Sequence, residues 1–364
     1  MENQLKNLQI YDINIKCEVV ILENIKNYDL DKLKAIFTED LSEKSYRAEQ
    51  VFKWLYVDKV DTFDEMTNLS LDLRKKLNEK FEISAYTIKT KQSSKDGTKK
   101  YLLELNDGNA VETVLMEYKY GRTICVSTQV GCKMGCRFCA STGLPFVRSL
   151  TSAEIVDQIL VVEKDEKIRI SNVVFMGIGE PFDNYENVIN AIKILNNQKG
   201  LSIGARHISI STSGLVPCIY RLADENIQCS LSISLHCTNN EKRSEIMPVN
   251  RKYNIEELMK ACKYYIEKTN RRISFEYALL CGENDTVADA DGLVKLLSGM
   301  LCYVNLIPVN KIENEPFKKT ADKNVIKFRD YLNEKGINAT IRRELGSDID
   351  AACGQLRRKS VKDK

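Results

Sequence analysis

Histidine is scarce in this chain, and long apolar runs are missing from it. Only 2 of the 364 residues are His. Structural zinc sites take four tetrahedral ligands, mostly from Cys and His, so a zinc site here would have to be built largely from cysteine. No apolar run approaches the roughly 18 residues that a membrane-spanning helix needs. We therefore expect a chain that does not span a membrane and whose metal chemistry depends on cysteine.

A secretion signal is also missing. The first residues, Met1–Lys6, begin neither the basic segment nor the apolar stretch of a signal peptide. We expect a soluble, cytoplasmic protein, whose 12 Cys then lie in a reducing compartment. Thiols in such a compartment serve chemistry or fill small buried positions, and structural disulfides are rare.

Neither sign of charge dominates the sequence. The chain has 54 Lys and Arg against 51 Asp and Glu, a net charge of +3. Global charge therefore neither requires nor excludes a nucleic-acid partner. Short basic clusters would form a phosphate-binding surface if they converged on one face. These clusters are Lys89, Lys91, Lys95, Lys99 and Lys100; Arg251 and Lys252; Arg271 and Arg272; Arg342 and Arg343; and Arg357, Arg358 and Lys359.

Three cysteines in one short loop are the main candidates for chemistry. Cys132, Cys136 and Cys139 follow an apolar run at 123–130 with the spacing C-x3-C-x2-C. Three thiolates leave one iron of a four-iron cluster without a protein ligand, whereas ferredoxins close their clusters with a fourth Cys. An iron left open in this way can bind and reduce S-adenosylmethionine. We predict an iron–sulfur site; the alternatives are a zinc site with a distant fourth ligand, or three free thiols.

The hydrophobic pattern divides the chain into regions of different period. Residues 1–25 are irregular and are interpreted as a leader, while 26–82 have the spacing of a small helical accessory domain. Residues 83–118 contain strand-like runs at 83–88, 100–105 and 110–116, separated by Asp-Gly turns, which predict a small antiparallel β region. Residues 119–350 form the core domain, and 351–364 a C-terminal segment.

Strands and helices alternate through the core domain, which is an α/β pattern. The predicted strands are 123–130, 171–178, 206–212, 229–235, 272–279, 302–308 and 338–342. The predicted helices are 152–165, 185–197, 217–225, 255–269, 287–300 and 323–335. Alternation of this kind builds a parallel sheet with right-handed crossovers. Six βα units and a last strand predict a barrel that is incomplete or laterally open, with its active site at the carboxyl ends of the strands.

Polar residues follow several of these strands. Gly179 and Glu180 follow the second, where glycine lets the backbone approach a ligand and the carboxylate can bind an ammonium group. Ser211 lies among hydroxyls at the end of the third strand, and these can bind ribose or a carboxylate. His236 follows the fourth strand and Asn310 the sixth. Each residue also has an ordinary structural explanation, but together they predict a site for a nucleoside-sized ligand.

Two further cysteines lie outside the loop. Cys125 belongs to the first predicted strand, seven residues before Cys132. Cys353 lies near the C-terminus among small residues that suit an accessible loop. The usual explanation for such a cysteine is a small buried side chain.

Taken together, these residues closely resemble the RlmN-type radical S-adenosylmethionine RNA methyltransferases, over about residues 30–358. The most specific feature is the pairing of the C-x3-C-x2-C loop with the terminal stretch Ala352–Leu356. The other matching stretches are Phe63–Ser70, Gly177–Asn184, Gly204–Ile208, Ser211–Gly214 and Ile341–Glu344. The resemblance implies a partial radical S-adenosylmethionine βα barrel with a helical RNA-binding accessory domain and a small β extension.

The resemblance also implies a role for each candidate residue. One 4Fe–4S cluster would be held by Cys132, Cys136 and Cys139. Cys353 would carry a methyl group, with Cys125 as its resolving partner and Glu112 as proton acceptor. The implied S-adenosylmethionine-binding residues are Gly179, Glu180, Ser211, Ser234, Leu235, His236 and Asn310.

The implied reaction is methylation of adenine C2, in the peptidyl-transferase region of 23S rRNA and in some tRNAs. This carbon lies between two ring nitrogens and is not nucleophilic, whereas a Cys thiolate readily attacks a sulfonium methyl. Our hypothesis is that Cys353 takes a methyl group from one S-adenosylmethionine. A second molecule is cleaved to a radical that activates this methyl for addition to C2. Cys125 then forms a disulfide with Cys353 and releases the product, while Glu112 accepts a proton.

The resemblance leaves two alternatives. A Cfr-type methylase would use the same cysteines, methylate adenine C8 and confer antibiotic resistance. The stretch Glu180–Asn184 and the longer N-terminal region favour the C2 enzyme. A non-catalytic RNA-binding protein with a structural metal site is the alternative from another class. For the C2 enzyme we expect two S-adenosylmethionine molecules per turnover, an electron donor such as flavodoxin or ferredoxin, and a monomer.

Overall fold

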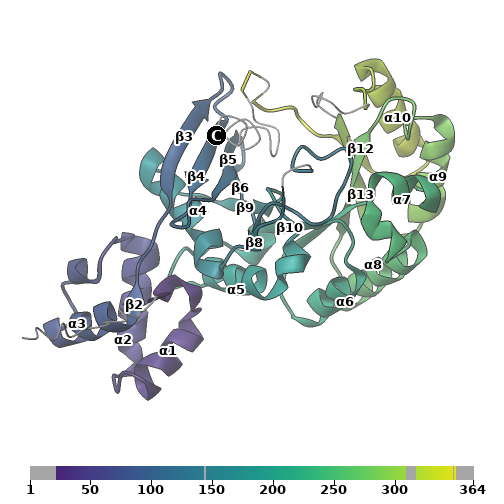
Figure 1. Ribbon diagram of the computed structural model, residues 1–364. Coiled ribbons are helices and arrows are strands. Elements are labelled where there is room, and N and C mark those ends of the chain that lie inside the picture. The colour runs from purple at the N-terminus through teal and green to yellow at the C-terminus, as the bar shows by residue number, and fades with distance from the viewer. Residues whose placement is uncertain (1–21, 143–144, 309–316, 347, 350–364) are drawn as a thin grey trace, which may run out of the picture.

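A sheet of ten strands forms the larger part of the molecule (Figure 1). The computed structural model describes residues 22–142, 145–308, 317–346 and 348–349. From one edge to the other, the strand order is β14-β13-β12-β11-β10-β9-β6-β5-β4-β3. The strand bounds are β3 Thr87–Ser93, β4 Lys99–Glu104, β5 Ala110–Tyr118, β6 Gly121–Cys125, β9 Asn172–Phe175, β10 Ile208–Thr212, β11 Ser230–Ser234, β12 Ile273–Leu279, β13 Cys302–Pro308 and β14 Ala339–Ile341.

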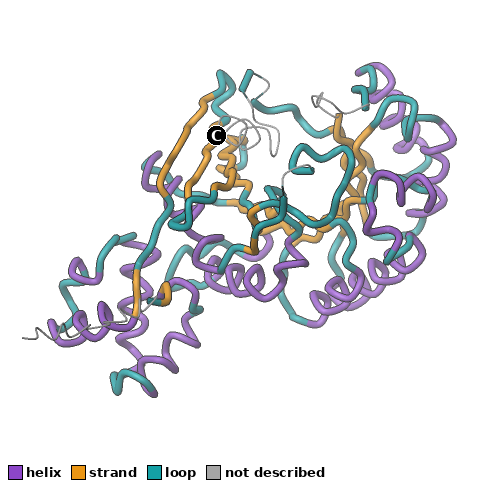
Figure 2. The backbone as a smooth tube through the Cα atoms, viewed as in Figure 1, coloured by secondary structure: helices purple, strands orange, loops and turns teal. Residues whose placement is uncertain are grey.

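Strands β6 and β9 to β14 pair in parallel, and helices connect them on the outer side of the curved sheet (Figure 2). The helices are α4 Ser152–Glu166, α5 Tyr185–Asn196, α6 Val216–Asp224, α7 Asn240–Ile246, α8 Ile255–Thr269, α9 Val287–Leu297 and α10 Asp322–Glu334. The strand order runs from β14 to β3 without closing. The predicted α/β partial barrel is therefore confirmed, including each of its parallel strands.

The antiparallel strands β3, β4 and β5 continue this sheet beyond β6, because β5 pairs with β6. They extend the barrel wall and do not form a separate sheet. One predicted strand, at 83–88, is wrong in its position, since the strand runs over Thr87–Ser93. This edge strand exposes most of its polar side chains, so it lacks the apolar alternation by which a half-buried strand is recognised.

The N-terminal residues form a helical module that stands to one side of the barrel (Figure 1). Its elements are β1 Glu23–Asn24, α1 Leu30–Glu39, α2 Ser45–Lys53, α3 Leu71–Lys80 and β2 Phe81–Glu82. Phe37, Phe52 and Leu73 are buried between the helices. A buried ion pair joins the module to the barrel, with Lys26 Nζ 2.5 Å from Asp157 of α4.

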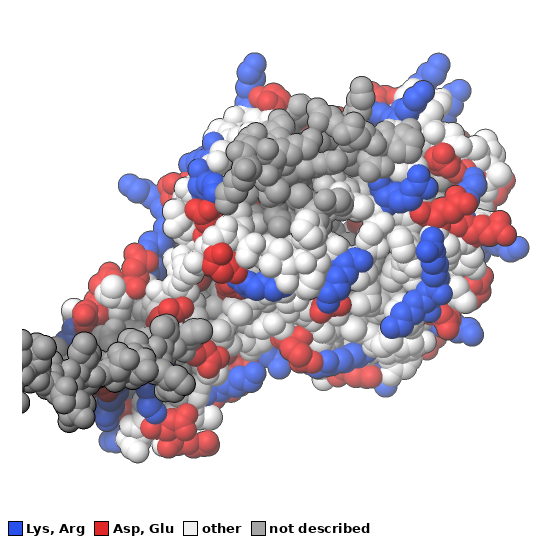
Figure 3. Space-filling view, viewed as in Figure 1, with Lys and Arg blue, Asp and Glu red and all other residues white. Residues whose placement is uncertain are grey.

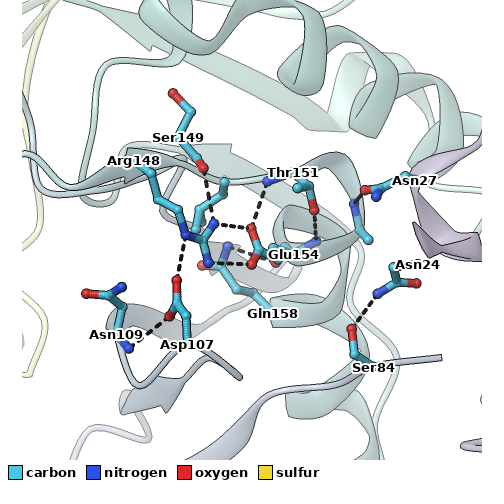
Figure 4. A network of polar contacts seen from close by, with 12 residues as sticks. Asn24, Asn27, Ser84, Asp107, Asn109, Arg148, Ser149, Thr151, Glu154 and Gln158 are labelled. Carbon is cyan, nitrogen blue, oxygen red and sulfur yellow. Dashed lines mark hydrogen bonds and ion pairs between the residues drawn. The ribbon is translucent and has the colours of Figure 1, made fainter. Parts of the chain in front are cut away.

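Arg148 connects the end of the Cys loop to the barrel wall (Figure 4). Its guanidinium donates to Asp107 in the β4–β5 turn at 2.7 Å and to both oxygens of Glu154 at 2.7 and 2.8 Å. Glu154 also accepts from the backbone N–H of Thr151 and so closes a capping box at the start of α4. The short strand β8, Arg148–Ser149, pairs with β7, Gln129–Val130, so the loop that carries the three cysteines is anchored at both ends.

Sequence analysis missed the short helix α7. It has seven residues, most of them polar, so its sequence shows no apolar periodicity. Among the described residues, no helix is both long enough and apolar enough to cross a membrane.

Candidate active site

A cavity of about 410 Å³ lies inside the curved sheet. This volume is in the range of small-molecule sites and suits a nucleoside-sized ligand. The predicted site residues that line it are Glu112, Cys125, Cys132, Cys136, Cys139, Gly179, Glu180, Ser211, Ser234 and His236. Segments that lie far apart in the sequence thus meet at one place, as the strand-end argument predicts.

The three-Cys loop borders this cavity. Its backbone turns tightly, with the N–H of Cys139 donating to the carbonyl of Cys136 at 3.0 Å. Burial raises the pKa of the Cys132 thiol to about 12, and burial also raises the pKa of the Cys136 thiol. Thiols in such surroundings remain protonated unless a metal takes the place of the proton.

The three thiols of the loop do not gather around one point. Within the described ranges, no three His, Cys, Asp or Glu side chains gather closely enough to hold one metal ion. The three cysteines instead border a common cavity. A four-iron cluster suits this wider arrangement, because each of the three thiolates binds a different iron and the fourth iron is left open.

Two glycines bring the end of β9 close to the start of the Cys loop. A Cβ on Gly177 would lie 2.6 Å from the carbonyl oxygen of Val126. Gly179 has φ +110°, and a Cβ there would lie 2.7 Å from both Thr128 Oγ1 and Gln129 Cβ. Both positions therefore require glycine for close packing, and Gly179 also for its backbone conformation.

Glu180 is buried and ties neighbouring strand ends together. One carboxylate oxygen accepts from the backbone N–H of Ser213 at 2.7 Å, and the other from the N–H of Phe182 at 3.1 Å. Burial raises the pKa of Glu180, and these backbone hydrogen bonds oppose the rise. The carboxylate thus holds the ends of β9 and β10 together while lining the cavity.

His236 is buried and lines the cavity. Its Nδ1 accepts from the backbone N–H of Ala278 at 2.9 Å, so the neutral ring carries its proton on Nε2. Phe138 of the Cys loop packs edge-on against the ring at 4.6 Å between centroids. Burial, followed by the charge of Arg243, lowers the pKa of His236 to about 3. The ring is therefore neutral at physiological pH.

Glu112 and Cys125 line the same cavity from neighbouring strands, β5 and β6. Glu112 is buried and pairs with Lys100 of β4, whose Nζ lies 2.9 Å away. Lys100 belongs by sequence to a basic cluster, but the structure buries its side chain completely and removes it from any phosphate-binding surface. Burial raises the pKa of the Cys125 thiol, while the charges of Arg342 and Lys100 oppose the rise.

Not every predicted site residue is placed in the cavity. The Leu235 side chain is buried in the core and does not border the cavity, so only its backbone faces neighbouring strand ends. Asn310 and Cys353 lie outside the described residues. Several other lining residues are not among the sequence-based predictions, and Thr98, Tyr118 and Glu276 are polar examples. Glu276 had a usable signal, because it is the only charged residue of the otherwise buried strand β12.

Two protein-family models match this chain. The large-subunit ribosomal RNA methyltransferase N-terminal domain matches residues 23–83, and the Radical SAM superfamily matches residues 126–294. A probable dual-specificity RNA methyltransferase RlmN of Clostridium perfringens strain SM101 is 52% identical over 344 residues, which are 94% of this chain and 99% of that relative. A protein of the same name from Bacillus subtilis is 51% identical and covers 93% of this chain and 94% of its own length.

A solved structure is similar as a whole. The radical SAM methyltransferase of Sphaerobacter thermophilus superposes with a TM-score of 0.86 at 41% identity, and the match covers 92% of this chain and 98% of that one. The open barrel and the three-Cys loop thus define a radical S-adenosylmethionine enzyme, whose cofactors are a 4Fe–4S cluster and S-adenosylmethionine. Within this class, the chain belongs to the RlmN family of RNA methyltransferases. The predicted family, fold and enzyme class are confirmed.

Proposed function

We propose that this enzyme methylates C2 of an adenine in the peptidyl-transferase region of 23S rRNA, and of an adenine in some tRNAs. The observation that carries the proposal is the shared cavity, in which the three-Cys loop, the strand-end residues of β9 to β11, and the pair Glu112 and Cys125 meet. Membership of the RlmN family supports the choice of substrate.

The chain's own residues divide the work between holding cofactors and handling the methyl group. Cys132, Cys136 and Cys139 would hold the cluster, which when bound supplies the electron that cleaves S-adenosylmethionine. Glu180, Ser211, Ser234 and the neutral His236 border the space for S-adenosylmethionine, with the backbone of Leu235 behind them. Gly179 allows the backbone to approach the ligand, and Asn310 completes this proposed set.

The remaining residues act on the methyl carrier. The Cys353 thiolate takes a methyl group from one S-adenosylmethionine, and a second molecule is consumed in activating it. The activated carbon adds to adenine C2 and links Cys353 covalently to the RNA, and this adduct would give up the C2 proton and return one electron to the oxidised cluster. Cys125 then attacks the Cys353 sulfur, so that the S–S bond forms, the bond from this sulfur to the transferred carbon breaks, and a proton completes the methyl group of the released RNA. Glu112 accepts a proton in this phase, and its ion pair with Lys100 holds its side chain in place in a buried position.

Two arginines in the cavity lining favour an RNA substrate. Arg342 and Arg343 line the cavity directly after β14. On the face shown in Figure 3, Lys and Arg are interspersed with Asp and Glu. The adenine must leave its stack to reach a reactive carbon inside a barrel, as bases do in other base-modifying enzymes. We propose that the two arginines bind the phosphates beside such an extruded base.

The proposal includes the protein's partners and location. Reductive cleavage needs an external one-electron donor, for which a flavodoxin or ferredoxin is suitable. We propose that the enzyme acts on RNA as a monomer. A cytoplasmic location follows from an RNA substrate of the ribosome.

The test is methylation of a 23S rRNA fragment by anaerobically reconstituted enzyme, followed by mass mapping of the nucleosides. We expect 2-methyladenosine from the wild type and from Cys281→Ala, a control at an exposed cysteine. Cys353→Ala should give no methylated nucleoside although its iron content is unchanged. Appearance of 8-methyladenosine would assign the chain to the C8 alternative. A fully loaded wild type that methylates no adenine would overturn the proposal.

A further inference from the structure

Arg243 is a fully buried cation on α7, behind the wall of the cavity. Its guanidinium donates four hydrogen bonds, three of them to backbone carbonyls. The acceptors are Leu235 O at 3.0 Å, Ser213 O at 2.8 Å, Ser234 O at 2.9 Å and Asn250 Oδ1 at 2.9 Å. One side chain thus joins the ends of β10 and β11, which both contribute residues to the cavity lining.

The same helix supports the Cys loop. The backbone N–H of Arg137, next to Cys136, donates to the carbonyl of Ile246 at the end of α7 at 2.9 Å. Cys136 and Phe138 pack against a small apolar cluster that includes Ile246 and Met247. The short helix therefore contacts both halves of the site, the cysteine loop on one side and the strand ends on the other.

The charge of Arg243 has no acidic partner in the part of the chain that the structure describes, where no Asp or Glu lies within ion-pair distance of it. The ionisable groups that interact with it electrostatically include the thiols of Cys136, Cys237 and Cys262 and the ring of His236. Burying a cation without a carboxylate is costly, and here carbonyl dipoles provide the compensation. The positive charge is therefore left to act on its surroundings, which include a cysteine of the loop.

We propose that Arg243 is a positioning residue with two separable effects: its hydrogen bonds align the β10 and β11 ends for S-adenosylmethionine, and its net positive charge, which has no carboxylate partner among the described residues, favours reduction of the iron–sulfur cluster. The inference rests on the proposed function, because it requires the cluster on the three-Cys loop. Reduction adds an electron to a site of low dielectric, where a nearby fixed positive charge stabilises the product. The guanidinium fork satisfies several acceptors at once, which an ammonium does only in part.

Two substitutions separate the effects. Arg243→Lys keeps the positive charge but loses the fork, and Arg243→Met loses both. In reconstituted holoenzyme, we expect both variants to bind S-adenosylmethionine at least tenfold more weakly in equilibrium dialysis. A potentiometric titration followed by electron paramagnetic resonance measures the midpoint potential of the cluster. In Arg243→Lys this potential should be close to the wild-type value. In Arg243→Met the equilibrium constant for reduction of the cluster should be at least tenfold smaller. This corresponds to a midpoint potential that is lower by at least about 59 mV for one electron.

Two controls keep the test interpretable. Arg329→Met removes an arginine on the outer helix α10 and should change neither quantity. If Arg243→Met does not fold, Asn250→Asp places a carboxylate beside the guanidinium, where the amide oxygen now lies at 2.9 Å, and should lower the potential in the same way.

The outcomes are distinct. A wild-type potential in both Arg243→Met and Asn250→Asp would overturn the electrostatic part. Unchanged S-adenosylmethionine affinity in both Arg243 variants would overturn the alignment part. A wild-type protein that assembles no cluster on the three-Cys loop would instead contradict the proposed function, independently of Arg243.

Discussion

His236 combines a buried neutral ring with a positive backbone φ of 56°. Few residues adopt this conformation readily, and Asn is among those that do. The ring accepts a backbone hydrogen bond through Nδ1, an interaction that the Oδ1 of an asparagine can imitate. Asparagine is therefore a substitute that keeps the backbone and this hydrogen bond while removing the titration.

We predict that His236→Asn weakens the acid sensitivity of the cluster-free protein. The folded-state pKa of about 3 lies below the usual value of His, so the unfolded chain binds the proton more strongly. The neutral His236 ring therefore makes its full contribution to the free energy of unfolding above about pH 6.5. This contribution is lost as the pH falls toward 3. At pH 5 the loss from this one group is about 2 kcal/mol.

Urea denaturation at pH 7 and pH 5 measures this effect. The decrease in the free energy of unfolding between the two pH values should be about 2 kcal/mol smaller in His236→Asn than in the wild type. His207→Asn is the matched control, because His207 is exposed. Equal decreases in the wild type and His236→Asn would show that the ring is not held neutral by burial.

A second residue-scale prediction concerns the pH dependence of product release. Burial raises the pKa of Cys125 above its usual value, so only a small fraction is thiolate at neutral pH. Because the thiolate is the nucleophile, decay of the covalent protein–RNA adduct should accelerate about tenfold per pH unit from pH 7 to 9. Gel analysis of quenched reactions measures the decay. A plateau below pH 8 would contradict the prediction, and Cys125→Ala should retain the adduct throughout.

At the scale of elements, the turn after β9 depends on a glycine in two ways. Gly179 has a positive φ, and its surroundings leave no room for a Cβ. Gly108 also has a positive φ, of +78°, but a Cβ added there would meet no atom within 4 Å. Gly108 is therefore required only for its backbone conformation, whereas Gly179 is required for close packing as well. We predict that Gly108→Ala lowers the free energy of unfolding by about 1 kcal/mol. Gly179→Ala should lower it by about 1–3 kcal/mol more than Gly108→Ala does.

Thermal or urea unfolding of both variants measures this difference, and equilibrium dialysis measures binding of S-adenosylmethionine. Gly179→Ala alone should weaken binding, because the displaced turn borders the cavity. Equal stability losses in the two variants would show that the close packing of the β9 turn is not important.

The sequence predicts the parallel strands and their helices well, because each element repeats its apolar residues with its own period. It does not predict α7, which is short and polar and is held by the buried bonds of Arg243. Arg243 and Lys100 look like surface cations in the sequence. Their burial depends on acceptors that are distant in the chain, such as Glu112 and Ser213, and only the folded structure brings these together.

At the scale of the whole molecule, two regions of one sheet line the cavity, and the helical module is attached beside them. The parallel strands contribute the cysteine loop and the ligand-binding ends, and the antiparallel extension adds Glu112 to the same lining. The helical module is joined to the barrel through the ion pair of Lys26 and Asp157 (Figure 1). This continuity explains how residues of one sheet can serve both cofactor binding and the resolution of a covalent intermediate.

The central claim is that the three cysteines hold a four-iron cluster with one iron open to S-adenosylmethionine. Anaerobic reconstitution with iron and sulfide counting, followed by Mössbauer spectroscopy with and without S-adenosylmethionine, tests it most directly. We predict four irons and four sulfides per chain, a change in the signal of one iron when S-adenosylmethionine is added, and loss of the cluster in Cys139→Ala. A cluster whose four irons are all unaffected by S-adenosylmethionine, or a chain that takes up zinc in its place, would contradict the account.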